Sequence, residues 1–109
     1  KPPVFYFETL TFEEQAEAFG HVDILVSPHG AQLTGIFFMP QCGSVVELFP
    51  RGYYKPPFFG SLAGIANLRH SHIYLGTNLT QEMEDGMKSL KTRNAARAPP
   101  LCAPVDKIV

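Results

Sequence analysis

The segment Asp23–Met39 constrains the fold of this chain more than any other. It begins with a run of aliphatic residues that ends at Val26, passes through Ser-Pro-His-Gly, and returns to an apolar pattern with helical spacing. Pro28 disfavours a helical conformation for the residue before it, and Gly30 lets the backbone turn sharply or approach a ligand closely. The pattern predicts a strand, a tight turn and a helix start, where unpaired N–H groups and the helix dipole favour an anion.

The rest of the chain continues this alternation of strands and helices. Thr11 and Glu14 have the spacing of a capping box at the start of the first helix. The uninterrupted apolar run of the second strand is typical of a parallel strand that is buried on both faces. Strands are predicted at Val4–Glu8, Val22–Val26, Ser44–Phe49 and His70–Leu75, and helices at Phe12–Phe19, Gln32–Met39 and Phe58–Leu68. This order predicts an α/β fold, a Rossmann-like parallel sheet flanked by helices.

We expect residues 1–76 to form the domain and residues 77–109 to form a C-terminal tail that is partly helical or disordered. A short exposed helix is predicted at Gln81–Leu90, and Thr92–Val109 is interpreted as mobile because it has no lasting apolar period. The chain begins with Lys1, without a signal-peptide pattern, so we expect a piece of a longer protein. The net charge of -1 gives no electrostatic case for nucleic acid, and no apolar run of the sequence is long enough to span a bilayer.

Candidate binding residues follow the predicted strands, because ligands of open α/β sheets bind beyond the carboxyl ends of the strands. The loops at these ends are Glu8–Thr11, Pro28–Gln32 and Pro50–Lys55. The second loop offers backbone N–H groups and His29, and the third offers Arg51, Lys55 and two tyrosines. Together they suit a phosphorylated ligand with an aromatic base. Glu47 lies near the end of a strand, where it could accept hydrogen bonds from ribose hydroxyls.

Each candidate also has a purely structural interpretation. His29 could cap a helix or hydrogen-bond a backbone carbonyl, and Glu47 could pair with a structural cation. The basic residues of the third loop could be solvated charges, and Tyr53 and Tyr54 could be packing residues. His70 and His72 share one face of a strand, without a third residue spaced to complete a metal site. The aromatic residues expected in the core are Phe37, Phe38, Phe58 and Phe59.

Several well-known site patterns are missing from the sequence. It has no GxxxxGK[ST] P-loop, no GxGxxG fingerprint and no GxSxG nucleophile elbow, so a hydrolase that uses His29 is disfavoured. No cysteine or histidine cluster has zinc-ligand spacing. A disulfide between Cys42 and Cys102 is an open alternative, because one pair alone does not fix the redox compartment. Asn78 begins an N-glycosylation sequon, which matters only if the chain enters the secretory pathway.

A set of linked motifs carries a family resemblance that runs from about Phe5 to Tyr74. The motifs are Phe12–Gln15, Asp23–Val26, Pro28–Thr34, Phe37–Pro40, Gly43–Pro50 and the pair Tyr53-Tyr54. In this order they resemble glycosyltransferase family 61, which includes xylosyl-, arabinosyl- and N-acetylglucosaminyltransferases. The resemblance implies the C-terminal, nucleotide-sugar-binding half of a GT-B fold. It also implies inverting transfer from a UDP-sugar to a glycan or glycoprotein acceptor.

The resemblance assigns donor-binding roles to particular residues. It places His29, Gly30 and Ala31 at the donor diphosphate and Glu47 at the ribose or uracil. His29 is the predicted catalytic residue, through stabilisation of the leaving group. The full set of predicted donor-binding residues is His29, Gly30, Ala31, Gln32, Leu33, Thr34, Glu47 and Arg51. No cofactor besides the UDP-sugar donor substrate is implied, no metal ligand is assigned, and a requirement for a divalent metal is left open.

The resemblance also has implications beyond the site. It implies a type II membrane protein of the Golgi or endoplasmic reticulum lumen, with its membrane anchor in a missing N-terminal part. Many family members have asparagine where this chain has Gly35, which weakens a helix by about 1 kcal/mol. No carboxylate of the chain stands out as the base that an inverting transfer needs. The competing interpretation is a non-catalytic nucleotide-sugar-binding or scaffold fragment that lacks the acceptor half.

Overall fold

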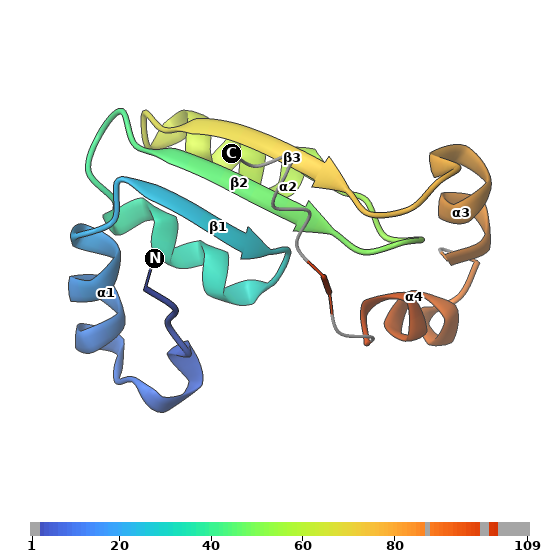
Figure 1. Cartoon of the computed structure of the whole chain (residues 1–109), viewed down its shortest axis with the longest axis horizontal. Helices are drawn as coiled ribbons and strands as arrows, with labels where there is room; N and C mark the ends of the chain where they lie inside the picture. The colour runs from blue at the N-terminus through green and yellow to red at the C-terminus, as the bar shows by residue number, and fades with distance from the viewer. Residues whose placement is uncertain (1–2, 87, 99–100, 103–109) are drawn as a thin grey trace.

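The computed structural model describes residues 3–86, 88–98 and 101–102. Its centre is a three-stranded parallel sheet in the order β1-β2-β3, formed by Ile24–Pro28, Ser44–Phe49 and Arg69–Tyr74 (Figure 1). In the register, Pro28 lies opposite Leu48, so β1 and β2 end at one edge of the sheet. The predicted α/β class, with a parallel sheet flanked by helices, is confirmed.

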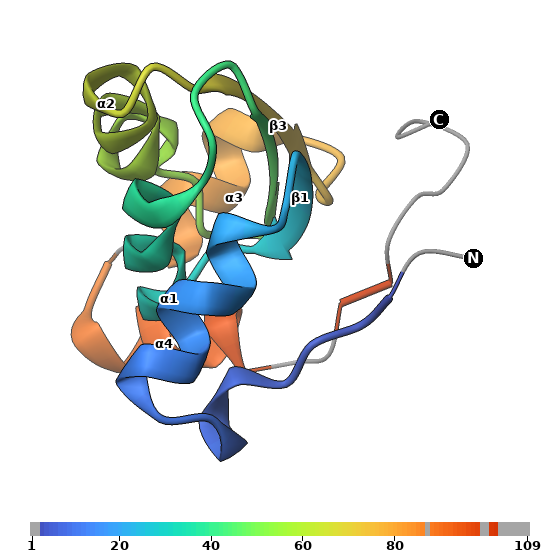
Figure 2. The same ribbon diagram turned by 90° about the vertical axis from the view of Figure 1, so that its left-hand side faces the viewer.

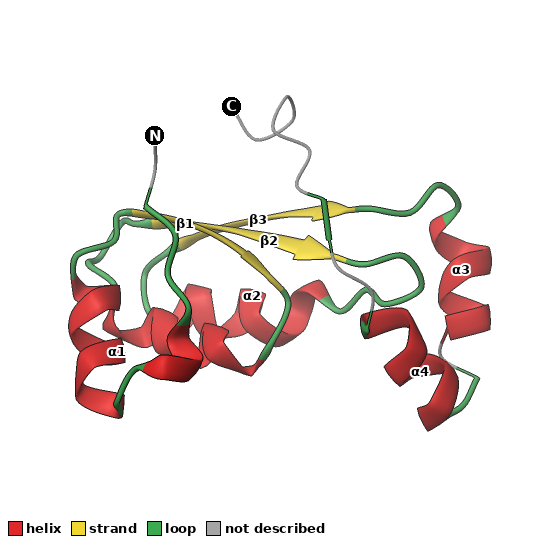
Figure 3. Ribbon diagram, turned by 60° about the horizontal axis from the view of Figure 1, so that its bottom comes forward, coloured by secondary structure: helices red, strands yellow, loops and turns green. Residues whose placement is uncertain are grey.

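The helices that connect the strands lie on one face of the sheet (Figure 3). They are the 3-10 helix η2 (Ala31–Phe38), between β1 and β2, and α2 (Pro56–Ile65), between β2 and β3. The preceding helix α1 (Phe12–Gly20) packs against η2 on the same side (Figure 2). Two further helices, α3 (Leu79–Gly86) and α4 (Leu90–Arg97), lie beyond the carboxyl ends of the strands.

The core fills the space between the covered face of the sheet and these helices. On the opposite face, Ile24 and Val26 of β1 are 70% and 41% exposed in the part of the chain that the structure describes. The expectation that this strand is buried on both faces is therefore wrong. The reason is the topology. The strand order is β1-β2-β3, so both crossover connections run toward the same edge of the sheet, and their helices lie on the same face. The buried core residues are Phe19, Leu33, Ile36, Met39, Val45, Phe59, Ala63 and Leu68.

The N-terminal helix begins as its sequence predicts. In α1 the N–H of Glu14 donates to the Thr11 hydroxyl at 3.2 Å, and the N–H of Thr11 donates to the Glu14 carboxylate at 3.0 Å. This reciprocal pair is the predicted capping box. The helix ends at Gly20, one residue beyond the predicted end, and it buries Phe19 against the core.

The segment Val4–Glu8 is not a strand, and that prediction is wrong. It runs into a short 3-10 helix, η1 (Phe7–Thr9). The Phe7 ring stacks on the ring of Phe19 with 4.8 Å between the centroids, and the Gln15 side-chain amide donates to the Phe7 carbonyl at 3.1 Å. Phe7 is used for packing on α1, whereas Tyr6 is 68% exposed, and the described chain has three strands rather than four.

The predicted helix Gln32–Met39 is a 3-10 helix instead of an α-helix. Its buried residues Leu33 and Ile36, followed by Met39, recur every third residue, which is the period that one face of a 3-10 helix presents. Residues between them point elsewhere, so the prediction that Phe37 and Phe38 lie in the core is wrong. Tight packing of η2 on α1 also explains Gly35, because a β-carbon there would collide with the Phe19 ring.

The second half of the chain follows its prediction more closely. The helix predicted at Phe58–Leu68 is α2, which begins two residues earlier and ends three residues earlier. It buries Phe59, but Phe58 is 67% exposed, so the prediction that Phe58 lies in the core is wrong. The strand predicted at His70–Leu75 is β3, displaced by one residue. The short helix predicted at Gln81–Leu90 overlaps α3, which begins two residues earlier and ends at Gly86.

The C-terminal segment contains a helix that the sequence analysis interpreted as mobile chain. Residues 90–97 form α4, which opens with a capping box between Ser89 and Thr92. The remainder of the predicted tail lies largely outside the described residues. Cys42 and Cys102 are both exposed and free, so the alternative of a disulfide between them is not realised. Within the described ranges, no helix has the length and apolarity that crossing a membrane requires.

The buried carboxylate of Glu82 attaches α3 to the end of the sheet. The Tyr74 hydroxyl donates to Glu82 Oε1 at 3.0 Å, and the N–H groups of Thr77 and Asn78 donate to the same oxygen at 2.9 Å. Arg51, in the turn after β2, pairs with the other oxygen. One side chain therefore joins α3 to the loops that follow β2 and β3.

These contacts also set the protonation behaviour of the cluster. Burial acts to raise the pKa of Glu82, but the hydrogen bonds from Asn78, Tyr74 and Thr77 and the charge of Arg51 outweigh it, and the pKa is lowered. The pKa of Tyr74 is raised, chiefly because its hydroxyl is removed from water.

Replacement of Gly35 with alanine should destabilise the fold. The added methyl group would meet the Phe19 ring, and overpacking of this kind costs about 1–3 kcal/mol. Gly64→Ala is the matched control, because a β-carbon at that position of α2 meets nothing within 4 Å. Thermal and urea unfolding should show a loss of stability for Gly35→Ala and an unchanged or higher stability for Gly64→Ala. Equal stability of the two variants would contradict the packing described for η2.

The Glu82 cluster should weaken as the pH falls. Because the pKa of Glu82 is lower in the folded chain than its ordinary value of 4.5, its contribution to stability is complete above pH 4.5 and is lost as the pH falls through the lowered value. Glu82→Gln should remove this part of the acid dependence, whereas Glu84→Gln, on the exposed side of the same helix, should retain it. Urea unfolding between about pH 3 and pH 7 measures the difference, and parallel curves for the two variants would refute it.

Candidate functional site

The centre of the candidate site is a carboxylate held between two imidazoles. Glu47 of β2 is 0% exposed, on the covered face of the sheet. Its Oε2 binds Nδ1 of His29, which follows β1, and its Oε1 lies 2.8 Å from Nε2 of His70 in β3. An ionised carboxylate only accepts hydrogen bonds, so these two ring nitrogens carry the protons. In a neutral His29 ring, Nε2 is then left as an acceptor.

Aromatic rings enclose the imidazole of His29. Its centroid lies 5.2 Å from those of Phe49, Tyr53 and Phe59, and 6.1 Å from that of Phe58. The His29 side chain is only 7% exposed, and its backbone N–H donates to the Leu48 carbonyl at 2.9 Å. The ring is therefore fixed in position by one polar partner and a wall of apolar contacts.

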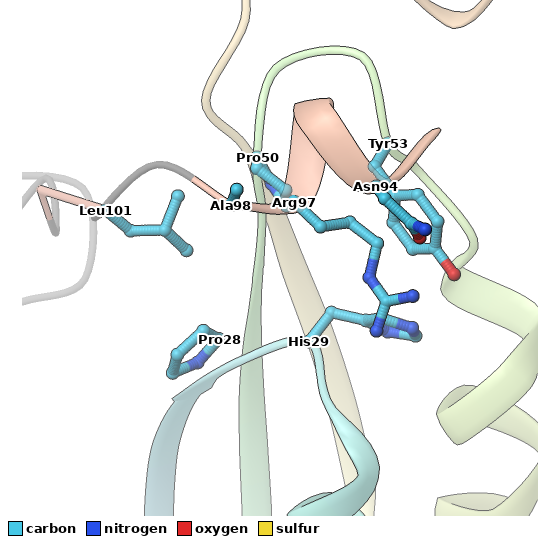
Figure 4. A pocket seen from close by; sticks show the side chains of 8 residues that line it. All are labelled: Pro28, His29, Pro50, Tyr53, Asn94, Arg97, Ala98 and Leu101. Atoms are coloured by element: carbon cyan, nitrogen blue, oxygen red, sulfur yellow. The ribbon is translucent and has the colours of Figure 1, made fainter. Parts of the chain in front are cut away.

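His29 lines an open cavity of about 620 Å³ at the carboxyl ends of β1 and β2 (Figure 4). Pro28 and Pro50, which end these two strands, form part of the wall. The other side is formed by α4, Ala98 and Leu101. The described residues that line the cavity are Pro28, His29, Pro50, Tyr53, Asn94, Arg97, Ala98 and Leu101, and none of these carries a carboxylate. The cavity therefore lies where ligands of open α/β sheets bind.

The turn after His29 carries backbone N–H groups at the start of η2, although Ala31 and Gln32 are not among the described residues that line the cavity. The first hydrogen bond of η2 runs from the N–H of Leu33 to the carbonyl of Gly30 at 3.0 Å, so the N–H groups of Ala31 and Gln32 precede it. Gly30 has an extended backbone with φ 177°, which any residue adopts, and the Gln32 amide lies against its α-carbon. A β-carbon at Gly30 would displace only the end of the exposed Gln32 side chain, so neither a left-handed turn nor a fixed contact requires glycine here.

Three residues of the predicted donor site, Leu33, Thr34 and Glu47, make contacts within the protein. Leu33 is completely buried in the core, and the Thr34 hydroxyl donates to the Ala31 carbonyl at 2.8 Å. Both carboxylate oxygens of Glu47 are engaged by the imidazoles of His29 and His70. The site roles predicted for these three residues remain predictions.

The structure does not bring Arg51 into the cavity beside His29. Arg51 pairs with Glu82 and faces a second hollow between the turn after β2 and the helices α3 and α4. Lys55 caps the start of α2 and does not line the cavity either. Tyr53 packs beside His29, whereas the Tyr54 hydroxyl lies 2.6 Å from Nε2 of His72.

Two polar residues of the cavity were missed by sequence reasoning. Asn94 and Arg97 come from α4, in the segment interpreted as a mobile tail. The signal that predicts this helix is the pair Ser89 and Thr92, spaced as in a capping box. The guanidinium of Arg97 lies over the Tyr53 ring, 5.0 Å from its centroid.

The remaining predicted sites lie apart from this cavity. Asn78 is exposed at the start of α3, where its side-chain oxygen accepts from the N–H of Gln81 at 3.3 Å. Among the described residues, no group of three or more histidine, cysteine, aspartate or glutamate side chains is placed to hold a metal ion.

Replacement of Glu47 with glutamine should loosen the site and destabilise the sheet. The amide keeps the volume but removes the charge that strengthens two hydrogen bonds, a loss of about 1.5–3 kcal/mol in the free energy of unfolding. Nitrogen NMR should also show that His29 no longer carries its proton on Nδ1 alone. The matched control is Glu17→Gln on the exposed side of α1. A Glu47→Gln chain with the control's stability and tautomer would contradict this arrangement.

Comparison with known protein families gives a match to the N-terminal part of the chain. The family model described as Glycosyltransferase 61 matches residues 3–46, which include α1, β1 and the turn at His29. No curated protein matches the chain. The match ends one residue before Glu47, so the resemblance beyond that point remains a prediction. Over residues 3–46 the resemblance to glycosyltransferase family 61 is confirmed, and the match supports a glycosyltransferase in general.

Proposed function

We propose that the cavity beside His29 binds the nucleotide-sugar donor of an inverting glycosyltransferase, and that this chain is the donor half of a GT-B enzyme that uses a UDP-sugar. The observation that carries the proposal is the His29 imidazole, fixed by Glu47 at the edge of a cavity that follows β1 and β2. The family match over the same turn supports it.

The proposed chemistry depends on charge at the donor diphosphate. When the bond between the sugar and the β-phosphate oxygen breaks, negative charge grows on that phosphate. The candidate donors are the N–H groups of Ala31 and Gln32 at the start of η2 and the His29 imidazole, which donates to a phosphate through Nε2 when both ring nitrogens carry a proton. Fixed donors of this kind lower the barrier because they need little reorganisation as the charge forms.

In this proposal Glu47 acts through His29 rather than on the ribose. Both of its oxygens are engaged and its side chain is buried, so a nucleoside has no free carboxylate to contact. A carboxylate at Nδ1 keeps the other ring nitrogen, Nε2, available for the ligand. Glu47 is therefore a positioning residue in the proposed site.

The remaining parts of the reaction are assigned to protein outside this chain. The acceptor is a glycan or glycoprotein, and its attacking hydroxyl loses a proton to a base as the new glycosidic bond forms. We propose that the other half of the enzyme supplies the acceptor site and the membrane anchor, and that the protein acts in the Golgi or endoplasmic reticulum lumen. The exposed position of Asn78 is compatible with glycosylation there.

Titration of the purified chain with UDP, UDP-GlcNAc and UDP-xylose by calorimetry tests the proposal. The wild-type chain should bind UDP, and the affinities of the two nucleotide-sugars should rank the donors. His29→Ala should weaken UDP binding by about 10- to 100-fold, the loss expected for one hydrogen bond to a charged group.

His21→Ala is the matched control, because His21 is an exposed residue at the end of α1. It should bind UDP as the wild-type chain does. A folded wild-type chain that binds none of the three ligands would favour the scaffold alternative. Equal affinity of the His29→Ala and wild-type chains would exclude His29 from the donor site.

A further inference from the structure

The cavity has one fully charged side chain in its lining, and that side chain comes from the C-terminal helix. Arg97 is the last residue of α4, and Figure 4 shows its guanidinium in the cavity that also contains the His29 imidazole. The family match stops at Val46, so it assigns no role to this residue. The sequence predicted Arg51 as the positively charged residue that binds an anionic ligand, but Arg51 faces a different hollow.

The charge of Arg97 is not neutralised by a carboxylate of the described chain. The described ion pairs are those of Arg51 with Glu82, Lys88 with Asp85, and the two histidines with Glu47. Among the residues that the structure describes, no aspartate or glutamate lines the cavity. A cationic cavity wall that lacks an acidic partner favours an anionic ligand.

Tyr53 holds the guanidinium in place. The Tyr53 ring is almost completely buried beside His29, and the guanidinium carbon lies 5.0 Å from its centroid. A cation–π contact of this kind uses none of the guanidinium N–H groups as hydrogen-bond donors, so they stay available to a ligand. The planar fork of an arginine matches two oxygens of a phosphate at once.

We propose that Arg97 binds the diphosphate of the ligand in this cavity, opposite the turn at His29, and that α4 is part of the donor site. The identity of the ligand as a nucleoside diphosphate rests on the proposed function. The placement of Arg97 does not, because it follows from the cavity and from the contact with Tyr53. The two groups approach the anion from segments far apart in the sequence, His29 from the end of β1 and Arg97 from the end of α4.

This inference assigns a role to the Glu82 cluster as well. Helix α4 follows α3 directly, the two helices pack together, and α3 is attached to the sheet through Glu82. The position of Arg97 therefore depends on a contact network that lies outside the cavity.

Calorimetric titration of the whole chain with UDP and with inorganic pyrophosphate tests the role of Arg97. Arg97→Ala should weaken the binding of both ligands by about 10- to 100-fold, since each loses one charged bidentate contact. Arg97→Lys should recover only part of the affinity, because an ammonium group cannot bind two oxygens in the same fork geometry. Lys91→Ala removes the same charge from an exposed position of α4 outside the cavity, and it should leave both affinities within about twofold.

The outcomes separate this inference from the proposed function. Binding of UDP that depends on His29 but is unchanged in Arg97→Ala would overturn the role of Arg97 alone. Binding of pyrophosphate that depends on Arg97, with UDP bound no more tightly than pyrophosphate, would support Arg97 and count against a nucleotide-sugar donor. A wild-type chain that binds neither ligand would overturn both. Circular dichroism and thermal unfolding of Arg97→Ala should match the wild-type chain, because the side chain is exposed.

Discussion

The buried Glu47 carboxylate is the interaction on which the rest of this structure depends. A carboxylate without exposure to water is costly unless charged or polar partners surround it. Here the partners come from both neighbouring strands, His29 from the end of β1 and His70 from β3. The same contacts that make burial of the charge tolerable also hold the three strands together and fix the imidazole at the cavity. Stability of the sheet and orientation of the site therefore have one physical origin.

A second buried carboxylate, that of Glu82, organises the other wall of the cavity. It gathers donors from the loops after β2 and β3 and so attaches α3 to the sheet. Close backbone contact between Gly52 and Gly86 allows this attachment, because a β-carbon at Gly86 would collide with the Gly52 carbonyl. The cavity thus lies between two parts of the chain, each organised by one carboxylate. Glu47 fixes the wall with the imidazole, and Glu82 supports the wall with the guanidinium.

Sequence reasoning succeeded where a local pattern determines the structure. The capping box of Thr11 and Glu14 and the strand–turn–helix pattern around His29 depend on neighbours within a few residues, and both are found. It failed where tertiary packing decided between local alternatives. The aromatic residues of Val4–Glu8 suit a strand, but Phe7 stacks on Phe19 of α1 instead. The apolar pattern of Gln32–Met39 suits an α-helix. In the structure every third residue is buried, and this spacing favours the tighter 3-10 form.

The candidate site also has features that a local sequence pattern predicts and features that only the tertiary structure determines. His29 could be predicted because its turn follows an apolar strand, and strand ends are where ligands bind in this fold class. The contacts around it could not be predicted. Glu47 lies 18 residues from His29, and His70 lies 23 residues from Glu47, so only the parallel register brings the three together. Arg97 is further still from His29 in sequence, and its helix has little apolar content to reveal it. A cavity wall built from a polar helix needs no apolar stripe, because its residues serve the ligand rather than the core. Such walls are the part of a binding site that hydrophobic patterns are least able to predict.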